Sequence, residues 1–268
     1  MEMVYRQRFL GARLMTRQLI GASILSKVDD AVRIQREYYT ETASRYDQMH
    51  AHEGDDDYRS VKLVDALFYM IRPNSVLDVG AGTGRGVLHF LETLPNASIC
   101  GIEPVEALID EAIKKGVPKN AIVRGAAESL PFADGSFDLV CSFALLHHVP
   151  SPNAVIREML RVAGKAVIVV DGNRFGQGRM AVRWLKLFLY KTGLWTLVNH
   201  LKTRGKGYLL TPGDGLAYSY SVYDSFECIA DWADELIVVP AGSGKAVTWL
   251  HPLLTASHVL VCATKNPV

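Results

Sequence analysis

Short apolar runs alternate with amphipathic stretches through the middle of the chain. Runs of strand length lie near residues 76–80, 98–103, 120–124, 137–142 and 165–171. After the first run, Val87, Leu88, Leu91 and Leu94 follow the three- and four-residue spacing of a helix. Strands that alternate with helices favour a mostly parallel sheet covered on both faces. The pattern therefore predicts a doubly wound α/β core over residues 75–171.

The segments on either side of this core have other patterns. Residues 29–71 predict helices with a polar break at 54–57, and Asp29 or Asp30 is suited to cap the first helix. Residues 237–239 and 258–263 predict the last strands, as an antiparallel pair that closes the sheet. We therefore divide the chain into a basic N-terminal arm or helix at 1–28 and one domain at 29–268, with an insertion at about 172–236.

A turn with three glycines at alternate positions follows the first strand. Asp78 ends the strand, and Gly80, Gly82 and Gly84 come next. Glycine permits positive φ and lets the backbone approach a ligand closely, and ligands bind at the carboxyl ends of parallel strands. The spacing misses the Gly-x-Gly-x-x-Gly of dinucleotide sites, and no Gly-Lys-Ser/Thr follows as in a P-loop. The turn therefore predicts a backbone-lined pocket for a ligand without phosphate.

The sequence Asp-x-Gly-x-Gly-x-Gly resembles motif I of the class I S-adenosylmethionine-dependent methyltransferases. Residues 98–103, 126–140 and 145–149 are similar to further motifs of the type 11 small-molecule branch, which includes the ubiquinone/menaquinone methyltransferases. This resemblance covers residues 38–171. It implies a Rossmann-like sheet that is mostly parallel with the last strand antiparallel, with helices on both faces. It also implies S-adenosyl-L-methionine as cofactor and S-adenosyl-L-homocysteine as product.

The resemblance also implies where the cofactor binds. Glu103, 19 residues after Gly84, is the expected acceptor for both ribose hydroxyls. The family often has an acid that binds the adenine amino group, but this chain has Ala126 at that position. Binding of adenine is therefore expected to depend on backbone groups near Ala127 and on neighbours such as Glu128. Tyr39 and Tyr46 match an entry segment that folds over the cofactor, with core packing as the alternative. The expected cofactor-binding residues are Tyr39, Tyr46, Asp78, Gly80, Ala81, Gly82, Gly84, Glu103, Pro104, Ala127, Glu128 and Ser142.

Three residues beyond the fourth and fifth strands are candidates for acid–base chemistry. A sulfonium methyl group is already activated, so the enzyme must align the acceptor and, for an oxygen nucleophile, remove a proton. His147 and His148 are suited to accept a proton near neutral pH, and Asp171 is an alternative base or orienting acid. A packing or local hydrogen-bonding role is the alternative for each residue, and proximity alone suffices for a carbon or amine acceptor.

Composition limits the remaining possibilities. A net charge of +1 gives no reason to expect nucleic acid as a partner. The cysteines at 100, 141, 228 and 262 form no close pair, so neither a disulfide framework nor a metal site is predicted. No apolar run approaches the roughly 18 residues of a membrane span, and the arginines near the N-terminus interrupt any signal-peptide core. The expected location is cytoplasmic.

The insertion is unusually basic. From Gly172 to Leu210 the chain has eight Lys or Arg residues and no Asp or Glu, interleaved with aromatic and aliphatic residues. This composition predicts a helical lid over the acceptor pocket, with its arginines solvated. The alternative is an amphipathic surface at 174–206 that makes peripheral contact with an anionic membrane, or a group of cations that recognises a phosphorylated substrate.

Together these features predict methyl transfer from S-adenosylmethionine to a small-molecule or lipid-linked acceptor. The alternatives are a cofactor-binding module without catalysis and a membrane-associated methyltransferase of a quinone or phosphorylated glycan. A dinucleotide oxidoreductase is disfavoured by the glycine spacing. A nucleic-acid methyltransferase is disfavoured because Ser142-Phe143-Ala144-Leu145 replaces the Asn/Asp-Pro-Pro-Tyr/Phe motif that grips a base. The sequence does not predict an oligomeric state.

Overall fold

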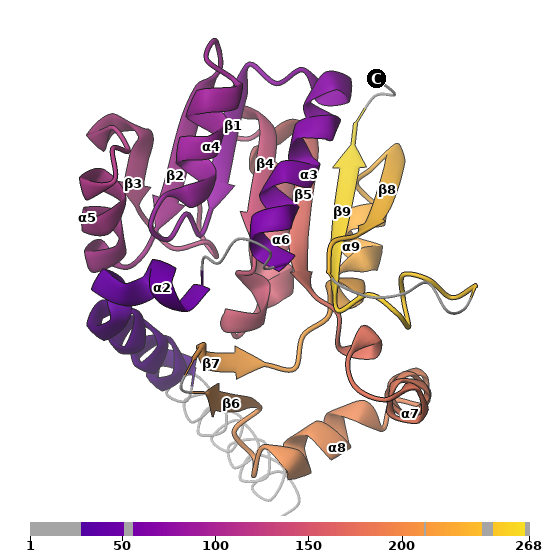
Figure 1. Ribbon diagram of the computed structural model, residues 1–268. Helices are drawn as coiled ribbons and strands as arrows, with labels where there is room; N and C mark the ends of the chain where they lie inside the picture. Colours follow the sequence, from indigo (N-terminus) through magenta and orange to yellow (C-terminus); the bar gives the residue numbers. More distant parts are fainter. Residues whose placement is uncertain (1–27, 51–55, 212, 243–248, 266–268) are drawn as a thin grey trace, which may run out of the picture.

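A seven-stranded sheet forms the centre of the computed structural model, which describes residues 28–50, 56–211, 213–242 and 249–265 (Figure 1). The strand order is β3-β2-β1-β4-β5-β9-β8. Strands β1 to β5 pair in parallel, whereas β9 runs antiparallel to both β5 and β8. The predicted Rossmann-like sheet is therefore confirmed. Its strands are β1 (Ser75–Val79), β2 (Ser98–Glu103), β3 (Ile122–Arg124), β4 (Phe137–Phe143), β5 (Ala163–Gly172), β8 (Glu235–Pro240) and β9 (His258–Thr264).

Helices cover both faces of the sheet, because each strand carries apolar side chains on both sides. In β4, Leu139 and Cys141 pack into one buried cluster and Val140 into the other. The first cluster is completed by α3 (Asp56–Ile71), α4 (Arg85–Thr93) and α5 (Glu106–Lys114). The second is completed by α6 (Pro152–Val162) and α9 (Phe226–Ala230). Two short 3-10 turns, η2 (Lys119–Ala121) and η3 (Leu146–His148), connect these elements.

Gly84 permits the close packing of α4 against α5. Its φ is +78°, and a Cβ there would lie 2.5 Å from Cγ2 of Val117 and 2.9 Å from Cβ of Ala112. A larger residue would have to displace buried side chains of a close-packed interior. The third glycine of the turn is thus required by the fold.

The N-terminal described segment crosses the carboxyl end of the parallel strands, at the bottom of Figure 1. It consists of a helix over residues 28–42, then η1 (Ala43–Arg45) and α2 (Tyr46–His50). Asp29 and Asp30 lie inside the helix, so the prediction that one of them caps it is wrong. Asp56 and Asp57, expected in a polar break, begin α3. Residues 1–27, which make up nearly all of the predicted basic arm, lie outside the described residues.

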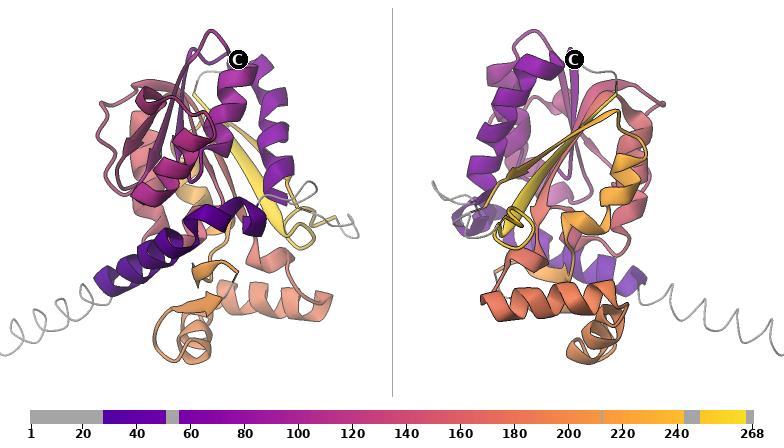
Figure 2. Two further views of the ribbon diagram at one scale, coloured as in Figure 1. Left: turned by 60° about the vertical axis from the view of Figure 1, so that its left-hand side comes forward. Right: turned by 90° about the vertical axis from the view of Figure 1, so that its right-hand side faces the viewer.

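The insertion leaves the sheet after β5 and lies beyond its carboxyl end (Figure 2). Its helical prediction is correct for α7 (Met180–Lys191) and α8 (Trp195–Lys202), which follow η4 (Arg174–Gly176). A β-hairpin then forms from β6 (Tyr208–Thr211) and β7 (Gly215–Tyr218), and η5 (Val222–Asp224) leads into α9. The sequence analysis did not predict this hairpin.

Polar contacts hold the insertion together and join it to the segment before β9. Arg174 is buried, forms an ion pair with Asp224, and stacks its guanidinium about 5 Å from the rings of Phe175, Tyr190 and Trp195. Nη1 of Arg183 donates to the carbonyl oxygen of Leu254 at 2.8 Å. Lys186 donates similarly to the carbonyl oxygens of Arg174 and Gln177. These three cations of the predicted basic surface therefore bind protein groups.

Candidate active site

A cavity lies at the carboxyl ends of β1, β2 and β4, where ligands bind in doubly wound folds. Its walls come from six parts of the chain that the fold brings together. These are the helix over residues 28–42, α2, the glycine turn, the end of β2 with the start of α5, the loop after β3, and the end of β4 with the segment that follows it. The lining residues are Val32, Gln35, Arg36, Tyr39, Tyr46, Gly80, Gly82, Ile102, Glu103, Pro104, Val105, Leu108, Ala127, Glu128, Phe143, Ala144, Leu145, His148, Val149 and Pro150.

Glu103 is the buried carboxylate of this cavity. Its Oε2 accepts a hydrogen bond from the backbone N–H of Gly82 and its Oε1 one from that of Val105, each at 3.0 Å. Burial raises the pKa of Glu103 to about 7, although both backbone hydrogen bonds oppose the shift. A carboxylate has about four lone-pair positions. Two of them therefore remain for donors from a ligand.

A second buried carboxylate, Asp78, lines a smaller cavity beside the first. Both cavities share the walls formed by Tyr46, Gly80 and Gly82. Burial raises the pKa of Asp78 to about 7, opposed by the positive charge of Arg85. A Cβ on Gly86 would come within 2.4 Å of Oδ2 of Asp78. The first turn of α4 therefore leaves room for this carboxylate.

Aromatic side chains cover the glycine turn. The rings of Tyr39 and Tyr46 meet edge to face with centroids 5.7 Å apart, and Tyr39 makes a similar contact with His148. A Cβ on Gly82, where φ is +54°, would lie 3.8 Å from the Tyr46 hydroxyl. A methyl-sized group at Gly82 would therefore just contact the Tyr46 ring. Both tyrosines border the cavity and also pack on Val105 and Leu108.

Most of the predicted cofactor-binding residues meet around the two cavities. Ala81 and Asp78 line the smaller one. Gly84 lines neither and packs against α5 instead. Ser142 is also outside both linings, and its hydroxyl is buried without a hydrogen-bond partner among the described residues. The remaining predicted residues line the larger cavity, namely Tyr39, Tyr46, Gly80, Gly82, Glu103, Pro104, Ala127 and Glu128.

The three predicted catalytic residues lie together at the edge of the larger cavity. Oδ1 of Asp171 lies 2.8 Å from Nδ1 of His147, and its Oδ2 accepts a hydrogen bond from the backbone N–H of Leu146. His148 lines the cavity, and its ring centroid lies 3.9 Å from that of His147. Asp171 is fully buried. Its carboxylate contacts His147 and the backbone amides of Leu146 and Gly172, and these contacts hold η3 at the end of β5.

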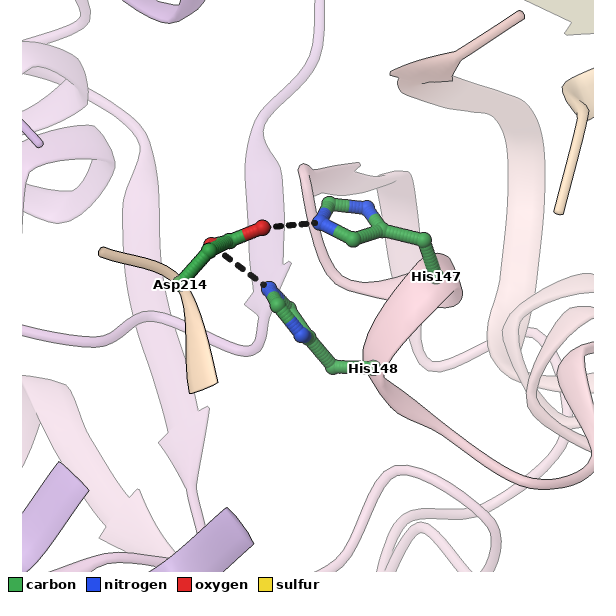
Figure 3. A group of neighbouring side chains, drawn as sticks. All are labelled: His147, His148 and Asp214. Carbon is green, nitrogen blue, oxygen red and sulfur yellow. Dashed lines mark ion pairs between the residues drawn. The ribbon is translucent and has the colours of Figure 1, made fainter. Parts of the chain in front are cut away.

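A fourth residue, Asp214, completes this cluster from the turn of the β6–β7 hairpin (Figure 3). Its carboxylate oxygens lie 3.5 Å from Nε2 of His147 and 3.3 Å from Nε2 of His148. Burial lowers the pKa of His147, but the carboxylates of Asp171 and Asp214 outweigh burial and raise that pKa to about 10. The two carboxylates thus favour the charged form of His147, which disfavours it as a proton acceptor.

Gln35 joins the helix over residues 28–42 to the hairpin. Its Oε1 accepts a hydrogen bond from the backbone N–H of Leu216 at 2.5 Å, and its Nε2 lies 3.1 Å from Nδ1 of His148. The sequence analysis missed both Gln35 and Asp214. Val32, Gln35, Arg36 and Tyr39 share one helix face at spacings of three and four, and this periodicity is the signal that points to Gln35. No local pattern marks Asp214.

Comparisons with known proteins agree with this geometry. Residues 77–170 match the model of a methyltransferase domain family. The chain is 31% identical over 134 residues to malonyl-[acyl-carrier protein] O-methyltransferase of Xylella fastidiosa, covering 48% of this chain and 45% of that protein. It is 31% identical over 142 residues to a ubiquinone/menaquinone biosynthesis C-methyltransferase of Paracoccus denitrificans, covering 49% and 56%. The chain thus matches about half the length of these curated relatives.

Solved structures extend the similarity of fold to most of the chain. A 1,6-didemethyltoxoflavin-N1-methyltransferase of Burkholderia thailandensis superposes with a TM-score of 0.58 at 14% identity, covering 89% of this chain and 90% of that one. The magnesium protoporphyrin IX methyltransferase of Synechocystis gives a TM-score of 0.57 at 16% identity, covering 88% and 100%. At these identities the comparison establishes the class I methyltransferase fold.

Proposed function

We propose that this chain, whose residues 77–170 belong to the methyltransferase domain family, transfers a methyl group from S-adenosylmethionine to a small-molecule or lipid-linked acceptor. The observation that carries the proposal is the position of Glu103. Its buried carboxylate faces the cavity at the end of β2, beside a glycine turn whose backbone is open to a ligand. S-adenosylmethionine supplies a methyl group on a positively charged sulfur, which needs no further activation.

The residues around the larger cavity fit the nucleoside part of this cofactor. Glu103 has two acceptor positions free, one for each ribose hydroxyl. Ile102, Val105 and Ala127 provide apolar walls for the adenine ring. Gly82 and Tyr46 line both cavities, so a chain that connects the two ends of the cofactor passes between them. A nucleoside held by a diol acceptor and apolar walls is thus the ligand that this cavity suits.

The smaller cavity fits a charged amino-acid end. Asp78 and Arg85 both line it, and they supply an acceptor for an ammonium group and a donor for a carboxylate. Asp47 closes the same cavity from α2, where it accepts a hydrogen bond from the Thr83 hydroxyl at 2.7 Å and pairs with Lys115. The two joined cavities therefore match the two ends of S-adenosylmethionine.

The acceptor binds on the hairpin side of the larger cavity. Val149 and Pro150 separate that cavity from a third one, which Tyr218 and Tyr220 also line. His148 contacts the acceptor because its ring borders the larger cavity on this side. Asp171 acts as a positioning residue through His147, because its carboxylate is fully buried.

Calorimetry with S-adenosylmethionine tests the cofactor site. Glu103→Ala removes the acceptor for the ribose and should weaken binding at least 10-fold, since hydrogen bonds to a charged group contribute about 1.5–3 kcal/mol. Glu106→Ala is the matched control, because Glu106 lies just after Glu103 but pairs with Arg124 at the surface. Unchanged affinity in Glu103→Ala would overturn the proposed site.

Methyl transfer itself needs an acceptor assay. The chain is incubated with radiolabelled S-adenosylmethionine and with quinols, carboxylic acids and phosphorylated glycans, and labelled product is separated from S-adenosylhomocysteine. The proposal expects a labelled product from one of these classes, and the product should disappear in Glu103→Ala. Tight cofactor binding with no product from any class would instead favour the binding module without catalysis.

We further propose that the insertion rests on an anionic membrane surface. Supporting this proposal, α7 and α8 have no buried residues, and they expose large apolar side chains that include Trp184, Phe188 and Leu201. Arg179, Lys191 and Lys202 lie exposed in the same segment. Apolar residues beside cations suit the boundary between lipid headgroups and acyl chains. Within the described ranges, no helix is both long and apolar enough to span a bilayer. Binding to anionic vesicles tests the proposal.

A further inference from the structure

The cluster formed by His147, His148 and Asp214 has the geometry of a cation site. Their ligand atoms lie within 4.8 Å of one another. Figure 3 shows both imidazole rings turned toward the same carboxylate, with the Nε2 atom of each ring nearest to it. The two separations between Nε2 and a carboxylate oxygen are 3.5 and 3.3 Å. Two ligands bound tetrahedrally at about 2.0–2.1 Å from one metal lie about 3.3–3.4 Å apart. Both separations are close to this value but involve different oxygens of Asp214, so small side-chain rotations would bring the three ligands onto one metal ion.

The opposite nitrogen of each ring is held by an acceptor. Nδ1 of His147 lies 2.8 Å from Oδ1 of Asp171, and Nδ1 of His148 lies 2.7 Å from the carbonyl oxygen of Leu216. A carboxylate only accepts, so Nδ1 of His147 carries a hydrogen. Nδ1 of His148 faces the Leu216 carbonyl oxygen at 2.7 Å and the Gln35 amide nitrogen at 3.1 Å, and the shorter contact favours a hydrogen on this nitrogen too. In the neutral tautomer each Nε2 then presents a lone pair. Metal-binding histidines are oriented in this way, by a carboxylate or carbonyl behind the ring.

Each Nε2 atom faces the Asp214 carboxylate, so positive charge is favoured between them. A proton on Nε2 of His147 supplies this charge for one ring only. Protons at both Nε2 atoms would create two imidazolium ions with ring centroids only 3.9 Å apart. A divalent cation satisfies both lone pairs and Asp214 at once. Its two charges also balance those of Asp171 and Asp214, which lie on opposite sides of His147.

We propose that His147, His148 and Asp214 bind one divalent transition-metal ion, with Asp171 as the outer partner of His147. Two imidazoles and one carboxylate suit ions such as Zn²⁺, Co²⁺, Ni²⁺ or Fe²⁺ more than Mg²⁺ or Ca²⁺, which prefer oxygen ligands. Three protein ligands leave a position for water or for an oxygen atom of a substrate.

The open coordination position bears on which acceptor is methylated, and this role of the metal rests on the proposed function. His148 borders the cavity, so an oxygen ligand on the metal would lie beside the proposed acceptor site. The metal would then select acceptors that carry a hydroxyl or carboxylate group. The hairpin contributes Asp214 to the site, so metal binding would also hold the hairpin against η3.

Titration of the metal-free full-length protein with Co²⁺ tests the site, because tetrahedral Co²⁺ has strong visible absorption bands. We expect one Co²⁺ per chain, displaced by Zn²⁺. His148→Asn and Asp214→Asn should each weaken Co²⁺ binding at least 100-fold. Asp171→Asn should weaken it about 10–100-fold, as outer partners do. The matched control is His200→Gln, which removes an exposed histidine of α8 and should leave Co²⁺ binding unchanged.

Asp214→Asn keeps the proposal falsifiable if the histidine variants fail to fold, because Asp214 lies in a partly exposed turn. Absence of the visible bands in the wild type, or equal Co²⁺ affinity in wild type and Asp214→Asn, would overturn the metal site. Calorimetry of the metal-free protein with S-adenosylmethionine separates this failure from that of the proposed function. If the protein binds S-adenosylmethionine but not Co²⁺, the proposed metal site is wrong and the proposed cofactor site stands.

Discussion

The backbone N–H of Gly82 donates a hydrogen bond to Oε2 of Glu103 at 3.0 Å, so the glycine turn after β1 is tied directly to the end of β2. The contact places a residue that lines both cavities next to a buried carboxylate. Arg36 of the helix over residues 28–42 faces the same carboxylate and favours its charged form. The charge of Glu103 therefore depends on groups from three separate elements.

The pH dependence of cofactor affinity should follow the ionisation of Glu103. Ribose hydroxyls donate to the charged carboxylate, and the pKa of Glu103 in the unliganded protein is raised to about 7. Wild type should bind S-adenosylmethionine about 10-fold more tightly at pH 8 than at pH 6 through this group. Asp78 titrates in the same range, so the informative quantity is the ratio of the dissociation constants of Glu103→Gln and wild type. Calorimetry should find that this ratio increases from pH 6 to pH 8, and a constant ratio would contradict the assignment.

The stability of the unliganded protein should show the opposite trend with pH. Glu103 is buried, and its pKa is raised from 4.5 to about 7, so the folded state keeps its proton where the unfolded state has lost it. Stability from this group is thus fully present below pH 4.5 and is lost as pH rises toward 7. The free energy of unfolding of Glu103→Gln minus that of wild type should increase by about 3 kcal/mol from pH 4.5 to pH 8. Urea denaturation measures it, with Glu106→Gln as the control at an exposed glutamate that follows β2.

Features that depend on residues close together in the chain could be predicted from the sequence. The strands near Val76, Ile99 and Val140 are buried on both faces, so each appears as a short apolar run. The glycine turn and Glu103 end two adjacent parallel strands, and this adjacency brings them together. Their positions followed from local patterns and from the family resemblance.

Contacts between segments that are distant in the chain could not be predicted from the sequence. Gln35 and Leu216 are 181 residues apart, and their hydrogen bond exists because the hairpin folds back over the helix. Asp214 lies in a Gly-Asp-Gly segment that reads as an ordinary turn. The histidines were identified, but their orientation toward Asp214 requires the hairpin. The arrangement on which the proposed metal site rests therefore could not be predicted from spacing alone.

Gly84→Ala should destabilise the fold and leave the affinity of the folded protein for S-adenosylmethionine nearly unchanged. A Cβ there meets Val117 and Ala112 and also takes a positive φ. We expect a loss of about 2–4 kcal/mol, from overpacking added to the backbone term. Gly116→Ala is the control, because Gly116 also has positive φ but nothing within 4 Å of the added Cβ, and should lose only about 1–2 kcal/mol. Equal losses would show that packing against α5 is unimportant.

Gln35→Leu should loosen the hairpin. The substitution leaves the buried N–H of Leu216 without its acceptor, which costs about 1–3 kcal/mol. Hydrogen exchange at the Leu216 amide should accelerate about 10-fold or more, while amides of the central strand β4 stay protected. Gln177→Leu, at an exposed position of the insertion, serves as the control. If Leu216 exchanged at the wild-type rate, the hairpin would be held by other contacts.

Binding of the insertion to membranes should depend on both charge and apolar contact. Each exposed cation near an anionic bilayer contributes about 1 kcal/mol, and the attraction decays over a Debye length of about 8 Å in physiological salt. Lys191→Glu with Lys202→Glu should therefore abolish cosedimentation with anionic vesicles, and high salt should weaken it in the wild type. Phe188→Ala should weaken binding through loss of an apolar side chain that is 60% exposed. Tyr69→Ala is the control, because Tyr69 is also highly exposed but lies on α3, which covers one face of the sheet. Equal loss of binding in Tyr69→Ala and Phe188→Ala, or binding to neutral vesicles at any salt, would contradict a specific anionic surface at α7 and α8.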